Sequence, residues 1–235
     1  MPGYLLKHET IAVVGAEALT IRSLLDRQQF SDPDGVALGL GISSAAWPLF
    51  GLVWPSGLHL AAAMAIRPVL ATERILEIGC GLGLASLVAH RRGGDVTASD
   101  CHPLASEFLR ENLRLNHLPP MPYCHGHWGG QAVETEHGPT VVGLFDLIIG
   151  SDVLYERDDL GVLTTFIGRH GAPACEVMIM DPNRGNRSPF SRRMAAMGFT
   201  LHETHIRRPK SETDNAYSGR MLNFRRVASA PGLPC

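Results

Sequence analysis

A glycine-rich turn followed by an acidic residue is the most informative pattern in this chain. The turn, Glu77-Ile78-Gly79-Cys80-Gly81-Leu82-Gly83, lies between an apolar run and a segment of helical periodicity. Glycines at such a junction let backbone N–H groups and the helix N-terminus approach a ligand closely. Asp100 ends the next apolar run, where a carboxylate can accept hydrogen bonds from ribose hydroxyl groups. The pattern predicts an adenosine-containing ligand.

Two other classes of nucleotide site fit this turn less well. A dinucleotide site has the spacing Gly-x-Gly-x-x-Gly, but the third glycine position counted from Gly79 holds Leu84. The chain has no Gly-Lys-Ser/Thr phosphate-binding sequence, which disfavours nucleoside triphosphates. The sequence alone leaves open that the three glycines mark only a tight turn.

The elements that would position these residues are short strands alternating with helices. From about residue 72 onward this alternation predicts a parallel sheet with crossover helices. The predicted strands cover residues 74–78, 96–99, 123–127, 144–149 and 176–180, and a helix over 191–197 ends at Gly198. Two more extended runs, 200–206 and 220–227, predict a C-terminal antiparallel hairpin.

The first part of the chain follows a different pattern. Runs over 10–14 and 19–24 flank a turn at Gly15 and predict a β-hairpin, and residues 59–70 predict a helix. Residues 28–53 are rich in Gly, Pro, Ser and Asp and predict a long ordered loop or a lid. We therefore expect an N-terminal extension over 1–50 packed on a core domain over 51–228, and a flexible tail over 229–235.

The composition fits a globular protein that is not exported. Of the 235 residues, 45% are hydrophobic and 19% are charged, and the apolar stretches are shorter than a membrane-spanning helix requires. We expect no membrane partner and no signal sequence. The five cysteines have no disulfide-framework spacing, which favours a reducing compartment such as the cytoplasm.

The net charge of -2 hides a basic C-terminal quarter. Residues 183–226 hold ten Lys and Arg against three Asp and Glu, or +7, so the rest of the chain carries -9. This quarter contains three Arg pairs, which are either solvated faces or a surface that docks an acidic partner, and it makes no strong case for nucleic acid. Cys101-His102 and Cys124-His125-Gly126-His127 lack a second cluster at zinc-binding spacing, so no metal site is predicted.

The glycine turn and Ala98-Ser99-Asp100 together resemble the first two motifs of the class I, seven-strand S-adenosylmethionine-dependent methyltransferases. The resemblance covers about residues 50–226. It implies a Rossmann-like α/β sheet with helices on both faces, closed by the terminal hairpin. It also implies that the glycine turn packs against the methionine part of S-adenosylmethionine and that Asp100 binds its ribose.

Further residues resemble the protein-lysine branch of that superfamily, methyltransferase family 16. Asp152-x-x-Tyr155 ends the fourth core strand, where nucleic-acid and glutamine enzymes usually carry Asn-Pro-Pro-aromatic. Val53-Trp54-Pro55-Ser56-Gly57 and Trp128 match the branch's tryptophan positions. The Trp-Pro-x-Gly form resembles members that modify the beta subunit of electron-transfer flavoprotein, which makes that protein a candidate substrate.

The resemblance implies a set of site residues. Asp152 would orient the acceptor amine and Tyr155 would wall its channel, while a strong general base is not required. Asp152 could instead only cap a helix, Tyr155 could be ordinary packing, and the two tryptophans could be core aromatics. Asp181-Pro182-Asn183-Arg184 either contacts substrate or simply ends a strand. The cofactor-binding residues would be Trp54, Glu77, Gly79, Cys80, Gly81, Gly83, Asp100, Cys101, Trp128 and Ser151.

The sequence thus predicts an S-adenosylmethionine-dependent N-methyltransferase that acts on a lysine side chain of a protein. A small-molecule N- or O-methyltransferase is the main alternative, and a lid over 28–50 that closes the site would favour it. A non-catalytic binding or assembly protein with the same fold is a second alternative. A nucleic-acid methyltransferase is a weaker one, because it rests only on the basic C-terminal quarter.

Overall fold

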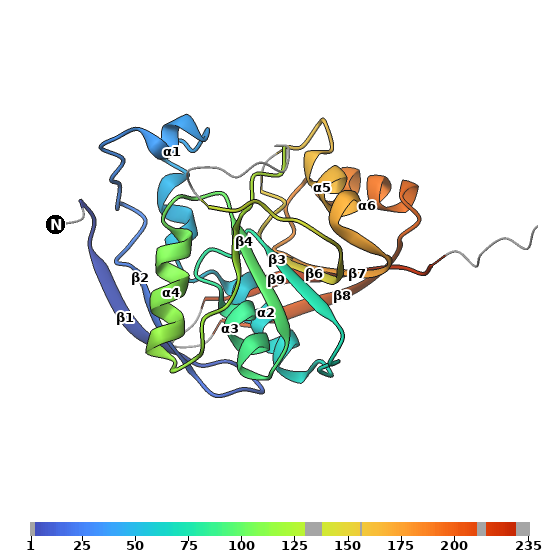
Figure 1. Ribbon diagram of the computed structural model, residues 1–235, viewed down its shortest axis with the longest axis horizontal. Helices are drawn as coiled ribbons and strands as arrows, with labels where there is room; N and C mark the ends of the chain where they lie inside the picture. Colours follow the sequence, from blue (N-terminus) through green and yellow to red (C-terminus); the bar gives the residue numbers. More distant parts are fainter. Residues whose placement is uncertain (1–2, 130–137, 156, 211–214, 229–235) are drawn as a thin grey trace, which may run out of the picture.

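The computed structural model describes residues 3–129, 138–155, 157–210 and 215–228 (Figure 1). Its main element is a seven-stranded sheet with the order β5-β4-β3-β6-β7-β9-β8. Six strands run in the same direction, and β9 runs antiparallel to both of its neighbours, β7 and β8. The strands are β3 (Arg74–Ile78), β4 (Asp95–Asp100), β5 (Tyr123–His125), β6 (Phe145–Ser151), β7 (Gly171–Asp181), β8 (Thr200–Arg208) and β9 (Tyr217–Arg226).

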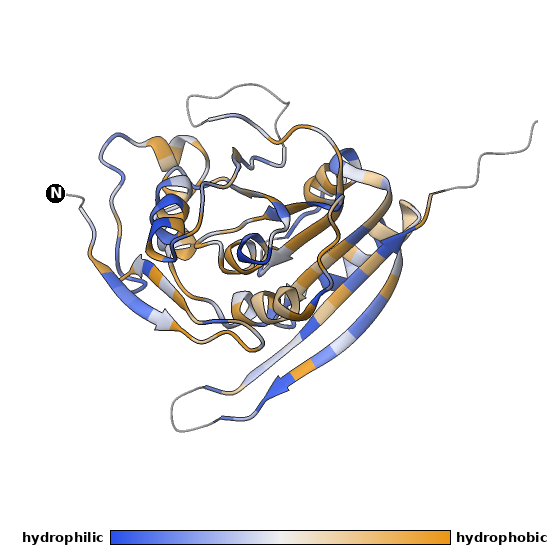
Figure 2. Cartoon of the chain, turned by 60° about the horizontal axis from the view of Figure 1, so that its bottom comes forward, coloured by the Kyte–Doolittle hydropathy of each residue, from blue (hydrophilic) through white to orange (hydrophobic). Residues whose placement is uncertain are grey.

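Helices cover both faces of the sheet, as predicted. Side chains of successive strand residues point to opposite faces, so Leu147 and Ile149 enter one hydrophobic core and Ile148 enters the other. The first core contains α2 (Pro55–Ile66), α3 (Leu84–Arg91) and α4 (Ala105–Leu115), and the second contains α5 (Val162–His170) and α6 (Arg187–Ala196). Figure 2 shows the central strands as hydrophobic and the outer strand β8 as mixed.

The strand order places one edge of the sheet at a topological switch point. From β3 the chain runs outward to β4 and β5, then returns to β6 on the other side of β3. The crossovers on either side of β3 therefore leave in opposite directions, and a crevice forms at the carboxyl ends of these strands. Gly79, Asp100 and Asp152 all follow or end strands at this edge.

Several predicted boundaries were wrong. Helix α6 begins at Arg187, not at residue 191, and strand β7 begins at Gly171, not at residue 176. Helix α2 begins at Pro55, not at residue 59, because proline is well tolerated in the first helical turn. It ends at Ile66, not at residue 70, because Arg67 precedes Pro68 and is extended. The first strand is β1 (Leu6–Ile11), not 10–14, since Leu6 pairs with Leu24 of β2 (Leu19–Leu24) and leaves a longer turn around Gly15.

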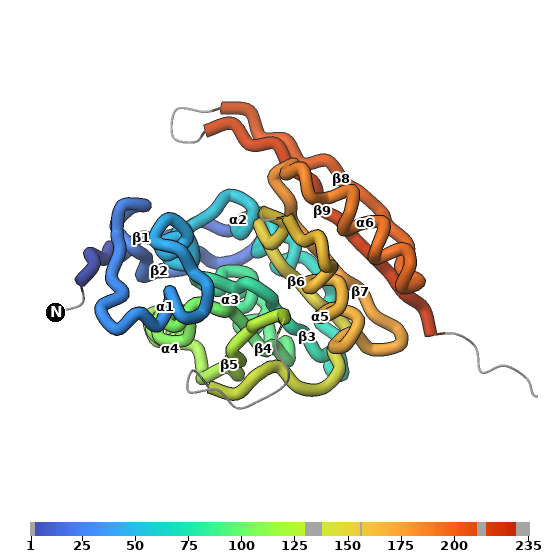
Figure 3. Tube along the Cα trace, turned by 90° about the horizontal axis from the view of Figure 1, so that it is seen from above, coloured from blue at the N-terminus to red at the C-terminus, as the bar shows by residue number. Residues whose placement is uncertain are grey.

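The N-terminal segment packs on the core through polar and aromatic contacts. Asn112 of α4 and Asn116, which directly follows that helix, accept hydrogen bonds from Arg22 N and Thr20 N of β2, at 2.8 and 3.0 Å. The segment also carries α1 (Val36–Gly39) and a 3-10 helix, η1 (Trp47–Gly51). Figure 3 shows this N-terminal hairpin near α4 and the β8–β9 hairpin along the far side of the sheet, next to α6. The predicted tail, 229–235, lies outside the described residues.

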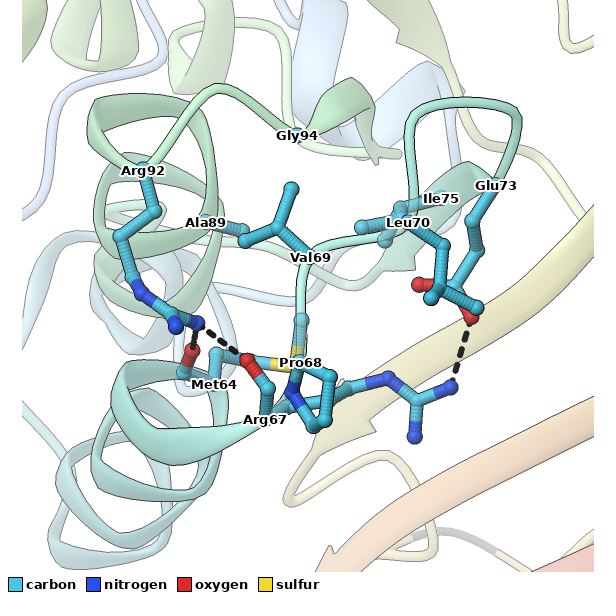
Figure 4. Close-up of a pocket in the computed structure, with 10 residues that line it drawn as sticks. All are labelled: Met64, Arg67, Pro68, Val69, Leu70, Glu73, Ile75, Ala89, Arg92 and Gly94. Carbon is cyan, nitrogen blue, oxygen red and sulfur yellow. Dashed lines mark hydrogen bonds and ion pairs between the residues drawn. The ribbon is translucent and has the colours of Figure 1, made fainter.

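The connection from α2 to β3 is held by two arginines (Figure 4). Arg92 Nη1 donates to the carbonyl oxygens of Met64 and Arg67, both at 2.6 Å, where the helix has no further N–H groups to offer. Arg67 in turn pairs with Glu73 at 2.7 Å. The cavity beside them holds only about 10 Å³, which is the scale of one water molecule.

The expectation that every apolar stretch is shorter than a membrane-spanning helix was wrong for Trp47–Ile66, which meets the length and composition of such a helix, with a mean hydropathy of 1.6. In the structure it consists of two elements, η1 and α2, separated by extended residues Leu52 and Trp54. Leu60 and Met64 are buried in the core of the sheet domain. Because the core helix of a globular domain passes the same test, the stretch is weak support for a membrane segment.

Trp47 provides a test of how firmly the N-terminal segment is packed. Its ring is buried and lies 5.6 Å from Tyr4, 5.8 Å from Phe50 and 5.3 Å from His102 between ring centroids. We expect Trp47→Ala to lower the free energy of unfolding by roughly 3–5 kcal/mol in urea titrations. Val14→Ala, at a side chain that is 81% exposed, should change it by less than about 0.5 kcal/mol. A loss below about 1 kcal/mol for Trp47→Ala would contradict this packing.

Candidate active site

A cleft of about 550 Å³ lies at the carboxyl edge of the sheet. Its walls come from the ends of β3, β4 and β6 and from the segment between β2 and α2. Most residues that the sequence assigned to a site line it, whereas Gly83 does not. The predicted residues in the lining are Trp54, Glu77, Gly79, Cys80, Gly81, Asp100, Cys101, Trp128, Ser151, Asp152 and Tyr155.

The floor of the cleft needs glycine at two positions for steric reasons. Gly79 and Gly81 have φ of 58° and 52°, in the left-handed region that disfavours other residues. A Cβ at Gly81 would lie 2.7 Å from the carbonyl oxygen of Phe50, and one at Gly79 would lie 3.0 Å from Val153 Cγ1. The bare backbone of this turn is therefore what leaves room for a ligand.

Gly83 has a different role from the other two glycines. It precedes α3 in the left-handed conformation, with φ of 75°. A Cβ there would lie 2.5 Å from Leu109 Cδ1 on α4. The residue therefore lets α3 and α4 pack closely and does not face the cleft.

Asp100 holds the glycine turn in place from the neighbouring strand. Its Oδ2 accepts a hydrogen bond from Gly81 N at 2.8 Å, and its Oδ1 accepts one from His102 N at 2.8 Å. Burial raises the pKa of this carboxyl, and the two backbone donors oppose that rise. Each carboxylate oxygen can accept a second hydrogen bond, so Asp100 can hold the turn and still bind hydroxyl groups.

Glu77 lies beneath the turn and is tied to α3. Its Oε2 accepts hydrogen bonds from Ser86 N at 2.9 Å and from Ser86 Oγ. The carboxyl is buried, and burial raises its pKa to about 7. Glu77 thus fixes the start of α3 relative to β3 in addition to lining the cleft.

Two buried donors in the cleft have no hydrogen-bond partner among the described residues: Trp128 Nε1 and His102 Nε2. His102 Nδ1 accepts from Leu104 N at 3.2 Å, and burial lowers the pKa of His102 to about 3, so its single proton at neutral pH is on Nε2. Unsatisfied buried donors are costly unless a ligand or water accepts from them. S-adenosylmethionine has ring nitrogens, hydroxyls and a carboxylate, so this lining fits it.

Trp54 and Phe50 form the wall on the N-terminal side. Trp54 Nε1 donates to the Leu49 carbonyl at 2.8 Å, and the guanidinium of Arg27 lies 5.5 Å from its ring centroid. Phe50 stacks on His102 with 3.6 Å between centroids. The predicted loop over 28–53 thus contributes side chains to the cleft at the end where the glycine turn lies.

The other end of the cleft is built around Asp152. This residue has a φ of 58°, and its N–H donates to the Met180 carbonyl at 3.0 Å. It does not cap a helix, because Asp158 accepts from the N–H groups at the start of α5, Val162 and Leu163, at 2.8 and 3.0 Å. Tyr155 is at the rim and is 46% exposed. A left-handed non-glycine residue at a strand end is typical of functional sites.

Sequence reasoning missed several residues that line the cleft. Phe50 and Arg27 lie in or beside the loop, and nothing in their spacing indicates where the loop packs. His102 was considered only for metal binding, and no group of three or more metal-binding side chains gathers in the described ranges. Arg184 had a signal, since the segment 181–184 was one of two options for substrate contact, and the structure places it in the cleft.

The basic C-terminal quarter is partly neutralised inside the fold. Arg187 and Arg220 both pair with Glu203, at 2.5 and 2.8 Å. Arg193 Nη1 donates to the Asp158 carbonyl, and Arg226 Nη2 donates to the Gly171 and Ala172 carbonyls. In each predicted Arg pair one residue is exposed and the other is half-buried, so the pairs are not uniform solvated faces.

Comparison with known families agrees with this geometry. A family model described as lysine methyltransferase (methyltransferase family 16) matches residues 50–194, more than half of the chain. The chain belongs to the lysine methyltransferase family. The matched range contains every residue that the sequence assigned to the site.

The proteins that this chain is similar to in sequence have different named substrates. The chain is 30% identical over 177 residues to the electron transfer flavoprotein beta subunit lysine methyltransferase of Danio rerio, covering 72% of this chain and 62% of the relative. It is 34% identical over 112 residues to a histone-arginine methyltransferase of Xenopus laevis, covering 46% of this chain and 45% of the relative. The chain spans between 55% and 62% of the length of the first relatives it matches.

A solved structure shows the same fold at low identity. Magnesium protoporphyrin IX methyltransferase from Synechocystis, crystallised with bound S-adenosylmethionine, aligns with a TM-score of 0.56 and 14% identity. The alignment covers 73% of this chain and 78% of that one. The predicted seven-strand methyltransferase fold is therefore confirmed.

Glu77 gives the structure a testable pH dependence. Because its folded-state pKa of about 7 exceeds the ordinary value of 4.5 for a glutamate side chain, the folded protein keeps a proton that the unfolded chain loses first. This group's contribution to the free energy of unfolding is therefore fully present below about pH 4.5 and is lost as the pH rises through about 7, by about 3 kcal/mol.

We expect Glu77→Gln to remove this dependence, because the amide oxygen can accept both Ser86 hydrogen bonds and carries no charge. The measurement is urea unfolding at pH 5 and pH 8. The surface substitution Glu17→Gln serves as the control, and its free energy of unfolding should change between pH 5 and pH 8 as that of the wild type does. If the free energy of unfolding of Glu77→Gln changed between pH 5 and pH 8 as much as that of the wild type, Glu77 would not be the source of the pH dependence.

Proposed function

We propose that this protein transfers the methyl group of S-adenosylmethionine to the side-chain nitrogen of a lysine in another protein. Membership of the lysine methyltransferase family supports the reaction class. The observation that carries the proposal is Asp152, a carboxylate held in a left-handed conformation at the exposed end of the glycine-floored cleft. A carboxylate there attracts and orients the cationic side chain of lysine.

The proposed assignment of residues follows the two ends of the cleft. The turn around Gly79 and Gly81, with Asp100 and Trp128, would hold the cofactor, since it combines bare backbone, a carboxylate and an unsatisfied donor. Asp152 and Tyr155 would hold the acceptor. When bound, S-adenosylmethionine supplies a methyl group on a sulfonium, an already activated leaving group, so the protein mainly provides orientation and exclusion of water.

The acceptor lysine must lose a proton before methyl transfer, and this requirement determines what the residues of the cleft must do. A lysine ammonium has no lone pair, and its unperturbed pKa is about 10.4, so it must lose a proton before it attacks. Asp152 would hydrogen-bond to the amine and favour the positive charge that remains on the methylated nitrogen. Tyr155, at the rim, would form one wall of the channel through which the lysine enters.

A small-molecule acceptor is the second candidate, and one observation favours it. The segment between β2 and α2 is ordered and lines the cleft, as a lid over a small substrate would. Its Phe50 contacts lie at the glycine turn and His102, however, and the acceptor end is more open, with Tyr155 46% exposed. This distribution supports an acceptor that enters from solvent.

The names of the relatives suggest which protein to try first. The beta subunit of electron-transfer flavoprotein is the substrate named for the Danio rerio relative, and we propose it as the first acceptor to test. We further propose a reducing compartment such as the cytoplasm, which the scattered cysteines support; the four within the described residues are free thiols.

The first experiment is labelling with methyl-labelled S-adenosylmethionine. The purified protein is incubated with recombinant electron-transfer flavoprotein beta subunit and, separately, with an extract from a host that lacks the gene. We expect label on a protein band that survives nuclease treatment. Label confined to small molecules would contradict a protein acceptor, and retention of S-adenosylmethionine without any transfer would favour a binding protein.

Asp100 and Asp152 should separate binding from turnover. Asp100→Ala removes the acceptor for Gly81 N–H, and we expect S-adenosylmethionine affinity in calorimetric titration to fall by roughly tenfold or more. Asp152→Asn should leave that affinity within about twofold of wild type and reduce turnover by at least about tenfold. Equal loss of cofactor binding in both variants would show that their roles are assigned wrongly.

A further inference from the structure

The carboxylate of Asp152 is already paired with a cation at the acceptor end of the cleft. Arg184 Nη2 lies 3.1 Å and Arg184 Nε 3.4 Å from the same oxygen, Asp152 Oδ1. Both side chains line the cleft. The side chain of Arg184 is 41% exposed and that of Asp152 is 16% exposed. An ammonium group that reaches Asp152 therefore meets a guanidinium beside the same carboxylate.

Arg184 is held at this place by the turn that carries it. Its backbone N–H donates to Asp181 Oδ2 at 3.1 Å. The preceding residue, Asn183, has a φ of 61°, donates to Ser218 Oγ at 3.1 Å and accepts from Arg220 Nε at 3.0 Å. Hydrogen bonds to Ser218 and Arg220 of β9 and to Asp181 thus hold the turn in place. They give the backbone of Arg184 a defined position.

Two charges of opposite sign act on an amine at this site. A carboxylate stabilises the ammonium form, which tightens binding but raises the pKa of the amine and withholds its lone pair. A neighbouring guanidinium carries a positive charge and acts in the opposite sense. Two other titratable groups sense the charge of Asp152: Asp181, at the end of β7, and Tyr217, at the start of β9.

We propose that Arg184 is a positioning residue that balances the charge of Asp152, so that the acceptor amine is held by the carboxylate and still loses its proton. The ammonium releases the proton to solvent at the exposed rim. The nitrogen lone pair then forms the bond to the methyl carbon, the carbon–sulfur bond breaks, and sulfur keeps that electron pair as a neutral thioether. This inference rests on the proposed function, and it makes Arg184 a determinant of turnover as well as of affinity.

A binding experiment tests the charge balance without turnover. The probe is n-butylammonium, which matches the end of a lysine side chain, titrated at pH 7 and low salt into protein saturated with S-adenosylhomocysteine. We expect Arg184→Met to bind it roughly three- to tenfold more tightly than wild type, because one positive charge near the amine is removed. Arg184→Lys should stay near wild type.

The matched control is Arg192→Met, which removes an exposed arginine of α6 that does not line the cleft. It should leave n-butylammonium affinity unchanged, and S-adenosylhomocysteine affinity should be the same in all variants, which confirms that they are folded. Unchanged or weaker n-butylammonium binding in Arg184→Met overturns the proposal. This readout does not depend on methyl transfer, so a wild-type enzyme that labels no protein contradicts the proposed function alone.

Turnover of the acceptor protein labelled by the wild type gives the second readout. In Arg184→Met we expect KM for the acceptor to fall several-fold and kcat at pH 7.5 to fall roughly tenfold, with the rise of kcat at alkaline pH displaced upward by about one pH unit. A side chain that only supports the fold would not move KM and kcat in this way. A lower KM with an unchanged kcat and pH profile would mean that Arg184 merely competes with the acceptor, which overturns the proposal.

Discussion

The hydrogen bond from Gly81 N–H to the Asp100 carboxylate is the constraint on which the site depends. It joins the turn after β3 to the end of β4, and it forms only because Gly79 and Gly81 take backbone conformations that bring the turn across the sheet edge. Because Gly81 has no side chain, the Phe50 carbonyl oxygen can approach the turn so closely that it would collide with a Cβ atom at this position. The N-terminal wall of the cleft is thus positioned by the same turn that forms its floor.

Fold and site were predictable to different degrees. Strands β3 and β6 are mostly buried, and each contains several adjacent large aliphatic residues and ends beside a glycine, so their predicted positions were nearly correct. The hairpin strand β1 was misplaced because its pattern of half-buried residues is weak and its register is set by pairing with β2. Local pattern therefore fixes buried elements better than edge elements.

The cleft residues also differ in how far the local sequence predicts them. Those in the turn after β3 and at the ends of β4 and β6 follow from strand ends, which the sequence marks with glycine and acidic residues. Phe50 and Arg27 reach the cleft through tertiary packing of the loop between β2 and α2, which no local spacing encodes, whereas Arg184 follows a strand end and was one of two options for substrate contact. The ion pair between Asp152 and Arg184 joins residues 32 positions apart on two different strand ends. Such pairs appear only once the topology is known.

The last strand in the sheet order, β8, has a consequence for self-association. It bonds to β9 on one side, and within the described residues no strand lies on the other, so a row of backbone N–H and C=O groups faces outward. An exposed edge of this kind invites strand addition by a second chain. His202, His205 and Arg207 are exposed along β8. Docking another strand would desolvate the charge of Arg207, and this opposes growth of the sheet beyond its seven strands.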